Sequence, residues 1–282
     1  MSEVSERPGL WSAEVARRWM TGGGHPTSDR IRGIAFDIDD TFSTHGQISA
    51  EAFTALSDLK KAGFWLVPVT GRPAGWCDHI ARFWPVDAVI GENGAFFIRR
   101  GIFRIEWITP RDGLSREVRA ERRAHLQSQL RAQFPGLQFA SDQAYRVSDL
   151  AVDFCEDVAP WEESKILALE QACREAGAVV KRSSIHVNTW YGDFDKAFGF
   201  EAWLASEPRA PQSLETWIYL GDSPNDEPQF AHFSKSVGVA NLKPFLNTLQ
   251  HPPAYLTTQE AGAGFCEVAQ DLLAALAPAV HP

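Results

Sequence analysis

The chain has 282 residues, of which 44% are hydrophobic and 22% are charged, and its formal net charge is −9. This composition is typical of a globular protein that is long enough for a large core. The negative charge argues against nonspecific binding of nucleic acid or of anionic membranes, but it is compatible with an anionic substrate because a local metal ion can override the global field.

The first half of the chain predicts a peripheral segment followed by alternating strands and helices. In residues 1–30, an amphipathic pattern over Leu10–Met20 predicts a short helix, and the glycines at 22–24 predict a hinge. An apolar strand is then expected to end at Asp37, and Ser49 is a suitable N-cap for the helix that follows. Further elements are expected at 64–70 (strand), 74–83 (helix) and 87–90 (strand). Such alternation predicts a parallel sheet with right-handed crossovers.

The rhythm changes after residue 94. A hairpin is predicted over 96–99 and 102–107, and a long charged helix over 115–133. The elements that follow are predicted at 150–154 (strand), 161–175 (helix), 178–181 (strand) and 185–190 (strand). This block is predicted to form an inserted α+β cap.

The parallel pattern returns in the last part of the chain. Strands are expected at 217–220, 236–239 and 254–256, and a closing helix at 264–276. We therefore predict an α/β protein with a Rossmann-like parallel-sheet core and an inserted α+β cap domain. The expected division is 1–30 (peripheral segment), 31–108 (core, first part), 109–188 (cap) and 189–282 (core, second part).

The segment 34–41 ends an apolar run with two aspartates one residue apart. Alternation along a strand points Asp37 and Asp39 to the same side, at the open end of a sheet, where ligands bind in open α/β folds. Two carboxylates this close repel each other unless a cation or a shared proton compensates. The pair indicates a divalent metal or a division of labour between nucleophile and acid, although Asp-Asp-Thr alone also suits an ordinary turn.

Three more polar elements follow in the chain, two of them at strand ends. They are Thr70-Gly71-Arg72, Asp193-Phe194-Asp195-Lys196 and Gly221-Asp222-Ser223-Pro224-Asn225-Asp226. Together with the first aspartate pair, and in this order, they resemble the four motifs of the haloacid dehalogenase-like superfamily, whose members are mostly phosphatases. The resemblance covers roughly residues 30–270. A large cap between the second and third motifs resembles the sugar-phosphatase branch (subfamily IIB, Cof-like), which is similar to the trehalose-phosphate, sucrose-phosphate and mannosyl-3-phosphoglycerate phosphatases.

The resemblance implies a nucleophile and an acid–base residue. Asp37 is the predicted nucleophile, because an ionised carboxylate can attack phosphorus and form an aspartyl-phosphate. Asp39 is predicted to protonate the leaving alcohol and then to deprotonate the attacking water. Asp40 stands where the family most often has glycine, and its side chain is expected to serve the turn.

The resemblance also implies sites for a metal and for phosphate. Carboxylate oxygens suit Mg²⁺, and the expected ligands are Asp37, Asp39 (through its backbone carbonyl), Asp222 and Asp226. The residues expected to bind phosphate are Thr70, Gly71, Lys196 and Asn225. Arg72 is expected to form a local salt bridge rather than to reach the substrate.

Substrate choice is expected to reside in the cap. The candidate contacts are Arg146, Ser148, Arg182, Ser184, His186 and Asn188, each of which also fits plain cap surface.

We predict a Mg²⁺-dependent phosphomonoesterase that acts on a small phosphorylated metabolite, with a sugar phosphate as the favoured class. A phosphosugar mutase of the same superfamily is not separated from a phosphatase by the sequence. A phospho-accepting signalling receiver is disfavoured by the Asp-x-Asp spacing and by the cap. The expected partner is a small phosphorylated substrate, without nucleic acid or membrane, and the expected oligomeric state is a monomer or a homodimer.

The protein is expected to be cytoplasmic. The four cysteines form no Cys-x-x-Cys pair, which suits reduced thiols. The N-terminus has no apolar stretch of signal-peptide length, and no run approaches the roughly 20 apolar residues that a membrane span requires.

Overall fold

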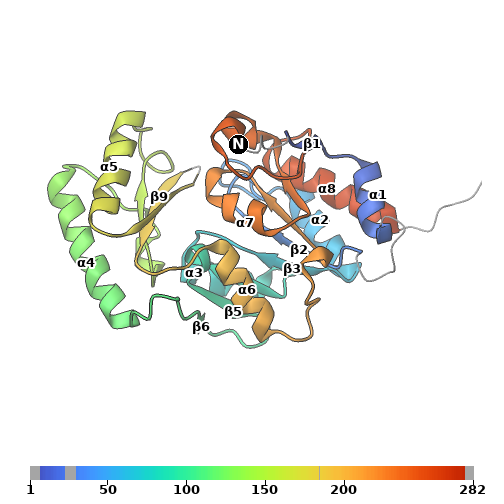
Figure 1. The fold of residues 1–282 in the computed structure, drawn as a ribbon, viewed down its shortest axis with the longest axis horizontal. Coiled ribbons are helices and arrows are strands. Elements are labelled where there is room, and N and C mark those ends of the chain that lie inside the picture. The colour runs from blue at the N-terminus through green and yellow to red at the C-terminus, as the bar shows by residue number, and fades with distance from the viewer. Residues whose placement is uncertain (1–6, 23–29, 184, 277–282) are drawn as a thin grey trace, which may run out of the picture.

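The computed structural model describes residues 7–22, 30–183 and 185–276. Its centre is a parallel sheet with the strand order β1–β12–β11–β10–β2–β3 (Figure 1). The strands are β1 (Gly9–Leu10), β2 (Gly33–Phe36), β3 (Trp65–Pro68), β10 (Trp217–Gly221), β11 (Ser236–Gly238) and β12 (Tyr255–Leu256). The predicted α/β class and parallel core are confirmed.

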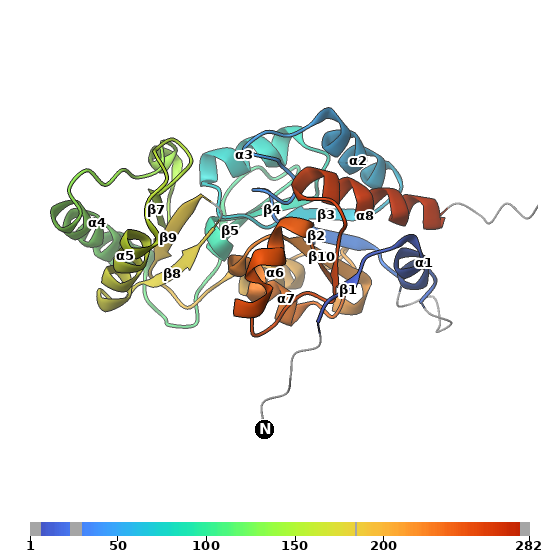
Figure 2. The ribbon, with the colours of Figure 1, turned by 90° about the horizontal axis from the view of Figure 1, so that it is seen from above.

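Helices cover both faces of this sheet, as Figure 2 shows. On one side lie α2 (Ala50–Lys61), α3 (Ala74–Phe83) and α8 (Ala261–Leu276), and on the other α6 (Lys196–Ser206) and α7 (Glu227–His232). The side chains of β10 alternate between the two layers: Ile218 and Leu220 join one hydrophobic core, and Trp217 and Tyr219 join the other. This alternation follows from the two-residue period of a strand, and both faces are apolar because both are covered.

The start of the chain lies against the edge of the sheet. The predicted helix is present as α1 (Ala13–Thr21), where the Ser12 hydroxyl accepts a hydrogen bond from the Val15 amide. Strand β1 precedes it and was not predicted from the sequence; it pairs with β12. The Trp11 indole also donates to Asp271 on α8 at 2.9 Å. The predicted glycine hinge lies largely outside the described residues.

The sheet continues into a small antiparallel extension. An isolated bridge between Val69 and Ile90 leads from β3 to β4 (Ala88–Gly91), which pairs with β5 (Phe96–Arg99) and then β6 (Glu106–Trp107). The predicted hairpin is therefore present, but its second strand begins at residue 106 instead of 102. The reason is local, because Gly101 and Phe103 have positive φ angles of 86° and 51°, which an extended strand does not allow.

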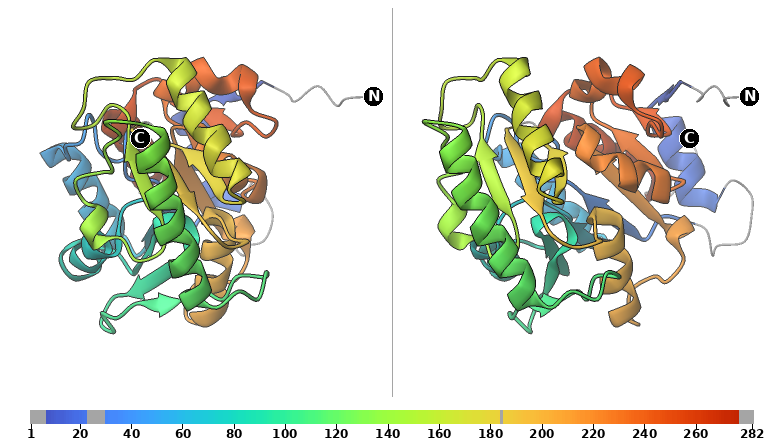
Figure 3. Two further views of the ribbon diagram at one scale, coloured as in Figure 1. Left: turned by 90° about the vertical axis from the view of Figure 1, so that its left-hand side faces the viewer. Right: turned by 60° about the vertical axis from the view of Figure 1, so that its left-hand side comes forward.

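The cap is an antiparallel sheet covered by two helices (Figures 1 and 3). The sheet order is β7 (Leu150–Asp153), β9 (His186–Trp190) and β8 (Val179–Arg182), and the helices are α4 (Arg116–Gln133) and α5 (Glu163–Glu175). These elements have a hydrophobic core of their own, which includes Leu126, Val152, Leu169 and Val187. Strand β9 runs to Trp190, two residues beyond residue 188, where the cap was expected to end. The boundaries between cap and core therefore stay a prediction.

Among the described residues, no helix is long and apolar enough to span a bilayer.

Candidate active site

Three neighbouring strands bring the first, second and fourth motifs to one edge of the sheet. Strand β2 lies between β10 and β3, and Asp37, Thr70 and Asp222 follow these strands. The Asp37 amide donates to the Leu220 carbonyl at 2.9 Å, which extends the pairing of the two strands to the nucleophile itself. Because parallel strands end at the same edge, residues that lie far apart in the sequence meet here.

Three buried carboxylates form a cluster at this edge. Each of Asp37, Asp222 and Asp226 offers an oxygen within 4.8 Å of the other two. Burial, together with the neighbouring carboxylates, raises the pKa of Asp37 to about 8 and raises the pKa of Asp222 well above its usual range. The cluster therefore has uncompensated negative charge and the oxygen donors that suit Mg²⁺.

Lys196 supplies the one cation that contacts this cluster directly in the described structure. It is the first residue of α6, which begins after Asp195, whose side chain accepts from the Phe198 amide. Its Nζ lies 3.0 Å from Asp37 Oδ1 and 2.7 Å from Asp226 Oδ1. Although burial opposes it, the two aspartates raise the pKa of Lys196. The lysine is thus held charged beside the predicted nucleophile.

Asp226 is saturated by hydrogen-bond donors. One carboxylate oxygen accepts from Lys196 and from the Tyr219 hydroxyl at 2.6 Å, and the other accepts from the amides of Asp222 and Ser223. This arrangement favours an indirect role toward a metal, in which Asp226 holds Lys196 and the loop in place. The loop packs tightly, because a Cβ at Gly221 would lie 2.6 Å from the Asp226 carboxyl carbon.

Two residues that were not predicted as ligands orient Asp222. The Thr41 hydroxyl donates to Asp222 Oδ1 at 3.2 Å. The Asn241 amide donates to Asp222 Oδ2 at 3.4 Å and to the Asp40 carbonyl at 3.0 Å. No local sequence signal identifies Asn241, because its role depends on the loop after β11. The Asp40 carboxylate accepts from the His45 amide, as expected of a turn residue.

The predicted phosphate-binding groups lie around the same edge. Thr70 is fully buried, and its hydroxyl accepts from the Arg72 amide at 3.0 Å. Gly71 lies against Asn93 and Asn188, whose side-chain oxygens would be 3.3 and 3.7 Å from a Cβ at this position. Asn225 lines the same small space as Asp37. Asn93 was not nominated from the sequence, yet its buried side-chain amide has no partner among the described residues.

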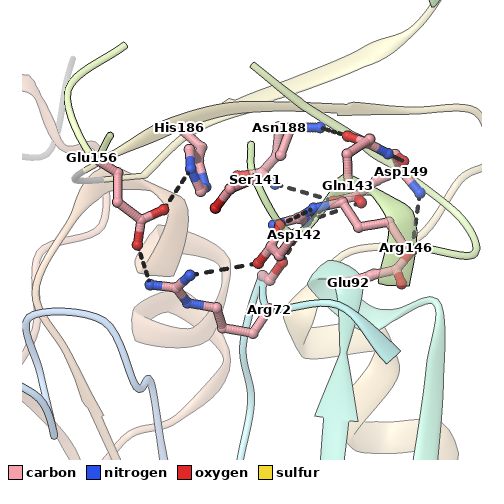
Figure 4. A network of polar contacts seen from close by, with 12 residues as sticks. Arg72, Glu92, Ser141, Asp142, Gln143, Arg146, Asp149, Glu156, His186 and Asn188 are labelled. Atoms are coloured by element: carbon pink, nitrogen blue, oxygen red, sulfur yellow. Dashed lines mark hydrogen bonds and ion pairs between the residues drawn. The ribbon is translucent and has the colours of Figure 1, made fainter. Parts of the chain in front are cut away.

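Arg72 connects the predicted acid–base residue to the cap. Its guanidinium binds Asp39 with two nitrogens, at 2.8 and 2.9 Å. It also donates to Glu156 at 2.8 Å, as Figure 4 shows. In turn, His186 Nε2 lies 2.9 Å from the second oxygen of Glu156. Although burial opposes it, His186 and Arg72 lower the pKa of Glu156 to about 2. The expected local salt bridge of Arg72 is present, and it extends further than the sequence indicated.

Arg146, predicted as a substrate contact, is held by the protein itself. Its fully buried guanidinium contacts Asp142 at 3.1 Å and Asp149 at 3.1 Å, and it donates to the Gly71 carbonyl at 2.8 Å. The guanidinium therefore ties the cap loop to the phosphate-binding loop of the core. It does line the space around Asp37, but the geometry favours a supporting role.

Glu92 forms a second connection between core and cap. It follows β4, is fully buried, and its carboxylate accepts from the amides of Ala74, Val147, Ser148 and Asp149. Burial, with the nearby Asp149, raises the pKa of Glu92 to about 7. We did not nominate this residue, although a glutamate that directly follows the apolar strand β4 was a usable signal.

The other predicted cap contacts separate into two groups. His186 and Asn188 line the same space as Asp37 and Asp39, and Asn188 donates to Asp149 at 3.1 Å. Arg182 instead pairs with Glu163 and Glu170 on α5, at 2.8 and 2.7 Å, so its guanidinium is engaged within the cap. The Ser148 amide binds Glu92, and Ser184 lies outside the described residues.

A cavity of about 360 Å³ adjoins Asp39. Its lining residues come from the core loop and from the cap: Asp39, Asp40, His45, Gly46, Arg72, Cys155, Glu156 and Ile185. Asp39 and Arg72 also line the much smaller space that contains Asp37. Asp39 therefore lies between the predicted nucleophile and a cavity large enough for a small organic group, since ligand pockets span about 300–1,000 Å³.

Comparisons with known proteins agree with this arrangement. Residues 34–106 match the family model of haloacid dehalogenase-like hydrolases. No curated protein matches the chain. A phosphatase of the haloalkanoate superfamily from Bacteroides thetaiotaomicron has a similar structure, with 16% identity, a TM-score of 0.61, and coverage of 90% of this chain and 99% of that chain.

Two other similar structures are named as, or as related to, phosphatases of sugar phosphates. The sucrose-phosphatase of Synechocystis sp. PCC6803 is 17% identical, with a TM-score of 0.58 and coverage of 85% of this chain and 97% of that chain. A trehalose-6-phosphate phosphatase related protein gives the same identity and TM-score, with coverage of 86% and 97%. These similarities concern the fold. The family match over residues 34–106 confirms the predicted resemblance to haloacid dehalogenase-like hydrolases and the prediction of an enzyme.

Proposed function

We propose that the protein is a Mg²⁺-dependent phosphomonoesterase that hydrolyses a small phosphorylated metabolite, a sugar phosphate by preference. The observation that carries the proposal is the placement of Asp37, which contacts Lys196 and has Asp222 and Asp226 within the same carboxylate cluster. Asp39 lies beside it, at the boundary with the larger cavity. A nucleophile, a cation and an acid–base residue are therefore within one site.

The reaction would proceed in two steps. Asp37 attacks phosphorus, the bond from phosphorus to the leaving oxygen breaks, and Asp39 delivers a proton to that oxygen. Asp39 then removes a proton from water, which attacks the aspartyl-phosphate and releases inorganic phosphate while Asp37 is regenerated. Lys196 and the groups at Thr70 and Gly71 would stabilise the charge that develops on the phosphoryl oxygens.

The residues present fit a divalent metal. Asp37 and Asp222 would hold it directly, with the Asp39 carbonyl, and Asp226 would support them. When bound, Mg²⁺ would offset the charge of the buried carboxylates and of the phosphoryl group. The raised pKa values of Asp37 and Asp222 support this proposal, because they report buried negative charge without sufficient compensation.

The preference for a sugar phosphate rests on the cavity next to Asp39. Its polar lining, with the carboxylates of Asp40 and Glu156, suits a leaving group that donates several hydrogen bonds. The fold that the chain shares with a sucrose-phosphatase supports the same class.

The proposal is tested with Asp37→Asn and with a panel of phosphorylated metabolites that includes p-nitrophenyl phosphate. Loss of the nucleophile in a covalent mechanism should lower turnover on the order of 10³-fold or more. Asp58→Asn is the matched control, because Asp58 is a partly exposed aspartate on α2 that pairs only with Lys61 among the described ion pairs. Near-normal hydrolysis by Asp37→Asn, or full activity in excess chelator, would refute the proposal.

The same assay separates a phosphatase from the alternatives. A phosphatase releases inorganic phosphate from a monoester, whereas a mutase converts one phosphosugar into another. A signalling receiver would accumulate a phosphoaspartate that lasts for minutes without turnover. The variant Asp39→Asn should trap the phosphoenzyme of a phosphatase by slowing its hydrolysis.

A further inference from the structure

A second polar cavity lies where the cap joins the core. It shares no lining residue with the cavities around Asp37 and Asp39. Its walls come from both parts of the protein. The core contributes Ala95, Trp107, Ile108 and Phe194, and the cap contributes Pro110, Arg116, Arg119, Ala120, Arg123, Val147 and Ser148. Its volume is about 30 Å³, against about 360 Å³ for the cavity beside Asp39, so it admits only a small group.

Three arginines reach this cavity from one helix. Arg116, Arg119 and Arg123 are three and four residues apart on α4, so they share one face of the helix. Arg122, next to Arg123 in the sequence, lies on another face, over the Tyr191 ring, and lines a different cavity.

Few negatively charged groups pair with the arginines of this cavity. Its described lining residues include no carboxylate. Among the described residues, the only ion pair of the three arginines is between Arg119 and Asp112, at 3.5 Å. The Arg116 guanidinium lies over the Trp107 ring at 4.8 Å. One nitrogen of Arg123 is buried without any hydrogen-bond partner, which is uncommon because an unmet buried donor is unfavourable.

We propose that this cavity binds a small anion with phosphate-like geometry, either inorganic phosphate or the phosphoryl group of a metabolite. The planar fork of an arginine matches the oxygens of such a group, and three arginines on one face form a binding site for it. An anion here supplies the partner that Arg123 lacks. The site is independent of the proposed hydrolysis, because none of its residues contacts the carboxylate cluster.

Because the site lies between cap and core, a bound anion should stabilise their contact. Val147 and Ser148 line the cavity, and their amides donate to Glu92 of the core. An anion held by α4 next to this segment favours the arrangement of cap and core seen in this structure, because it binds a cavity that both parts form.

The test is a calorimetric titration of the full-length protein with inorganic phosphate, in excess chelator and at constant ionic strength. Without divalent metal, the carboxylate cluster disfavours phosphate at the candidate active site. Arg123→Gln is compared with the neighbouring Arg122→Gln, which removes the same charge from the same helix. We expect one phosphate per chain in the wild type and in Arg122→Gln, and binding about tenfold weaker in Arg123→Gln, as for a lost charge-assisted hydrogen bond.

A second titration with glycerol phosphate distinguishes the two sources of the anion. Binding of both probes assigns the site to a phosphoryl group, and binding of inorganic phosphate alone assigns it to the free ion. In the wild type, phosphate should also slow hydrogen exchange of the amides at 147–149. Equal affinity in all three proteins, or no saturable binding, would overturn the proposal, because the arginines would then serve only as surface charge.

Discussion

Replacing Glu92 by glutamine tests whether this buried carboxylate holds the cap to the core. The carboxylate accepts four backbone hydrogen bonds: one from the core, at Ala74, and three from the cap segment 147–149. Glutamine has nearly the same shape but only one acceptor oxygen. Two of the four amides would therefore face an NH₂ group that cannot accept a hydrogen bond.

The expected loss follows from these two amides. Each unmet buried donor costs about 1–3 kcal/mol, so the sum is about 2–6 kcal/mol. Glutamine also removes the charge that burial and Asp149 disfavour, as the raised pKa of Glu92 shows, and this offsets part of the loss. We therefore expect the free energy of unfolding to fall by about 2 kcal/mol, a large part of a typical total of about 5–15 kcal/mol.

The assay is urea unfolding above the pKa of about 7 of Glu92, where its carboxylate is ionised. Glu121→Gln, at an exposed position of α4, is the matched control and should stay within about 0.5 kcal/mol of the wild type. If Glu92→Gln is as stable as this control, the four amides do not depend on the carboxylate. The role of Glu92 in holding the cap would then be refuted.

Three further predictions concern the candidate active site. Glu156→Gln should lower kcat/KM for a sugar phosphate about tenfold, because Arg72, which orients Asp39, loses a charged partner. Unchanged kinetics would show that the contact between Glu156 and Arg72 has no catalytic role. Lys196→Met should destabilise the metal-free protein by about 3–5 kcal/mol, because it leaves buried carboxylates unpaired, and a melting curve equal to that of the wild type would contradict this. Burial raises the pKa of Asp37 from 3.8 to about 8, so its contribution to stability is complete below pH 3.8 and is lost as the pH rises through 8. In chelator, the melting temperature should therefore fall over this range, and Mg²⁺ should raise it more at the alkaline end; a larger Mg²⁺ effect at the acidic end would contradict the reasoning.

The sequence predicted the parallel core and the residues that gather at its edge. Asp37 and Asp222 could be identified because each follows an apolar strand, and parallel strands end at the same side of a sheet. The existence of a cap followed from the change in rhythm after residue 94. Local backbone conformation limited the accuracy of the predicted strand ends. The positive φ angles at Gly101 and Phe103 shorten the second strand of the hairpin, and the pattern of apolar residues does not reveal such angles.

Tertiary structure alone decided which charged groups pair with one another. Arg72 joins Asp39 and Glu156, which lie 33 and 84 residues away, and Arg146 reaches the Gly71 carbonyl across 75 residues. From the sequence, an arginine that contacts substrate cannot be told from one that holds a loop. The two differ only in the partners that folding brings to the guanidinium. Strand patterns and motif order depend on neighbours along the chain and can be read from it, whereas the pairing of core and cap depends on how two units with separate hydrophobic cores meet.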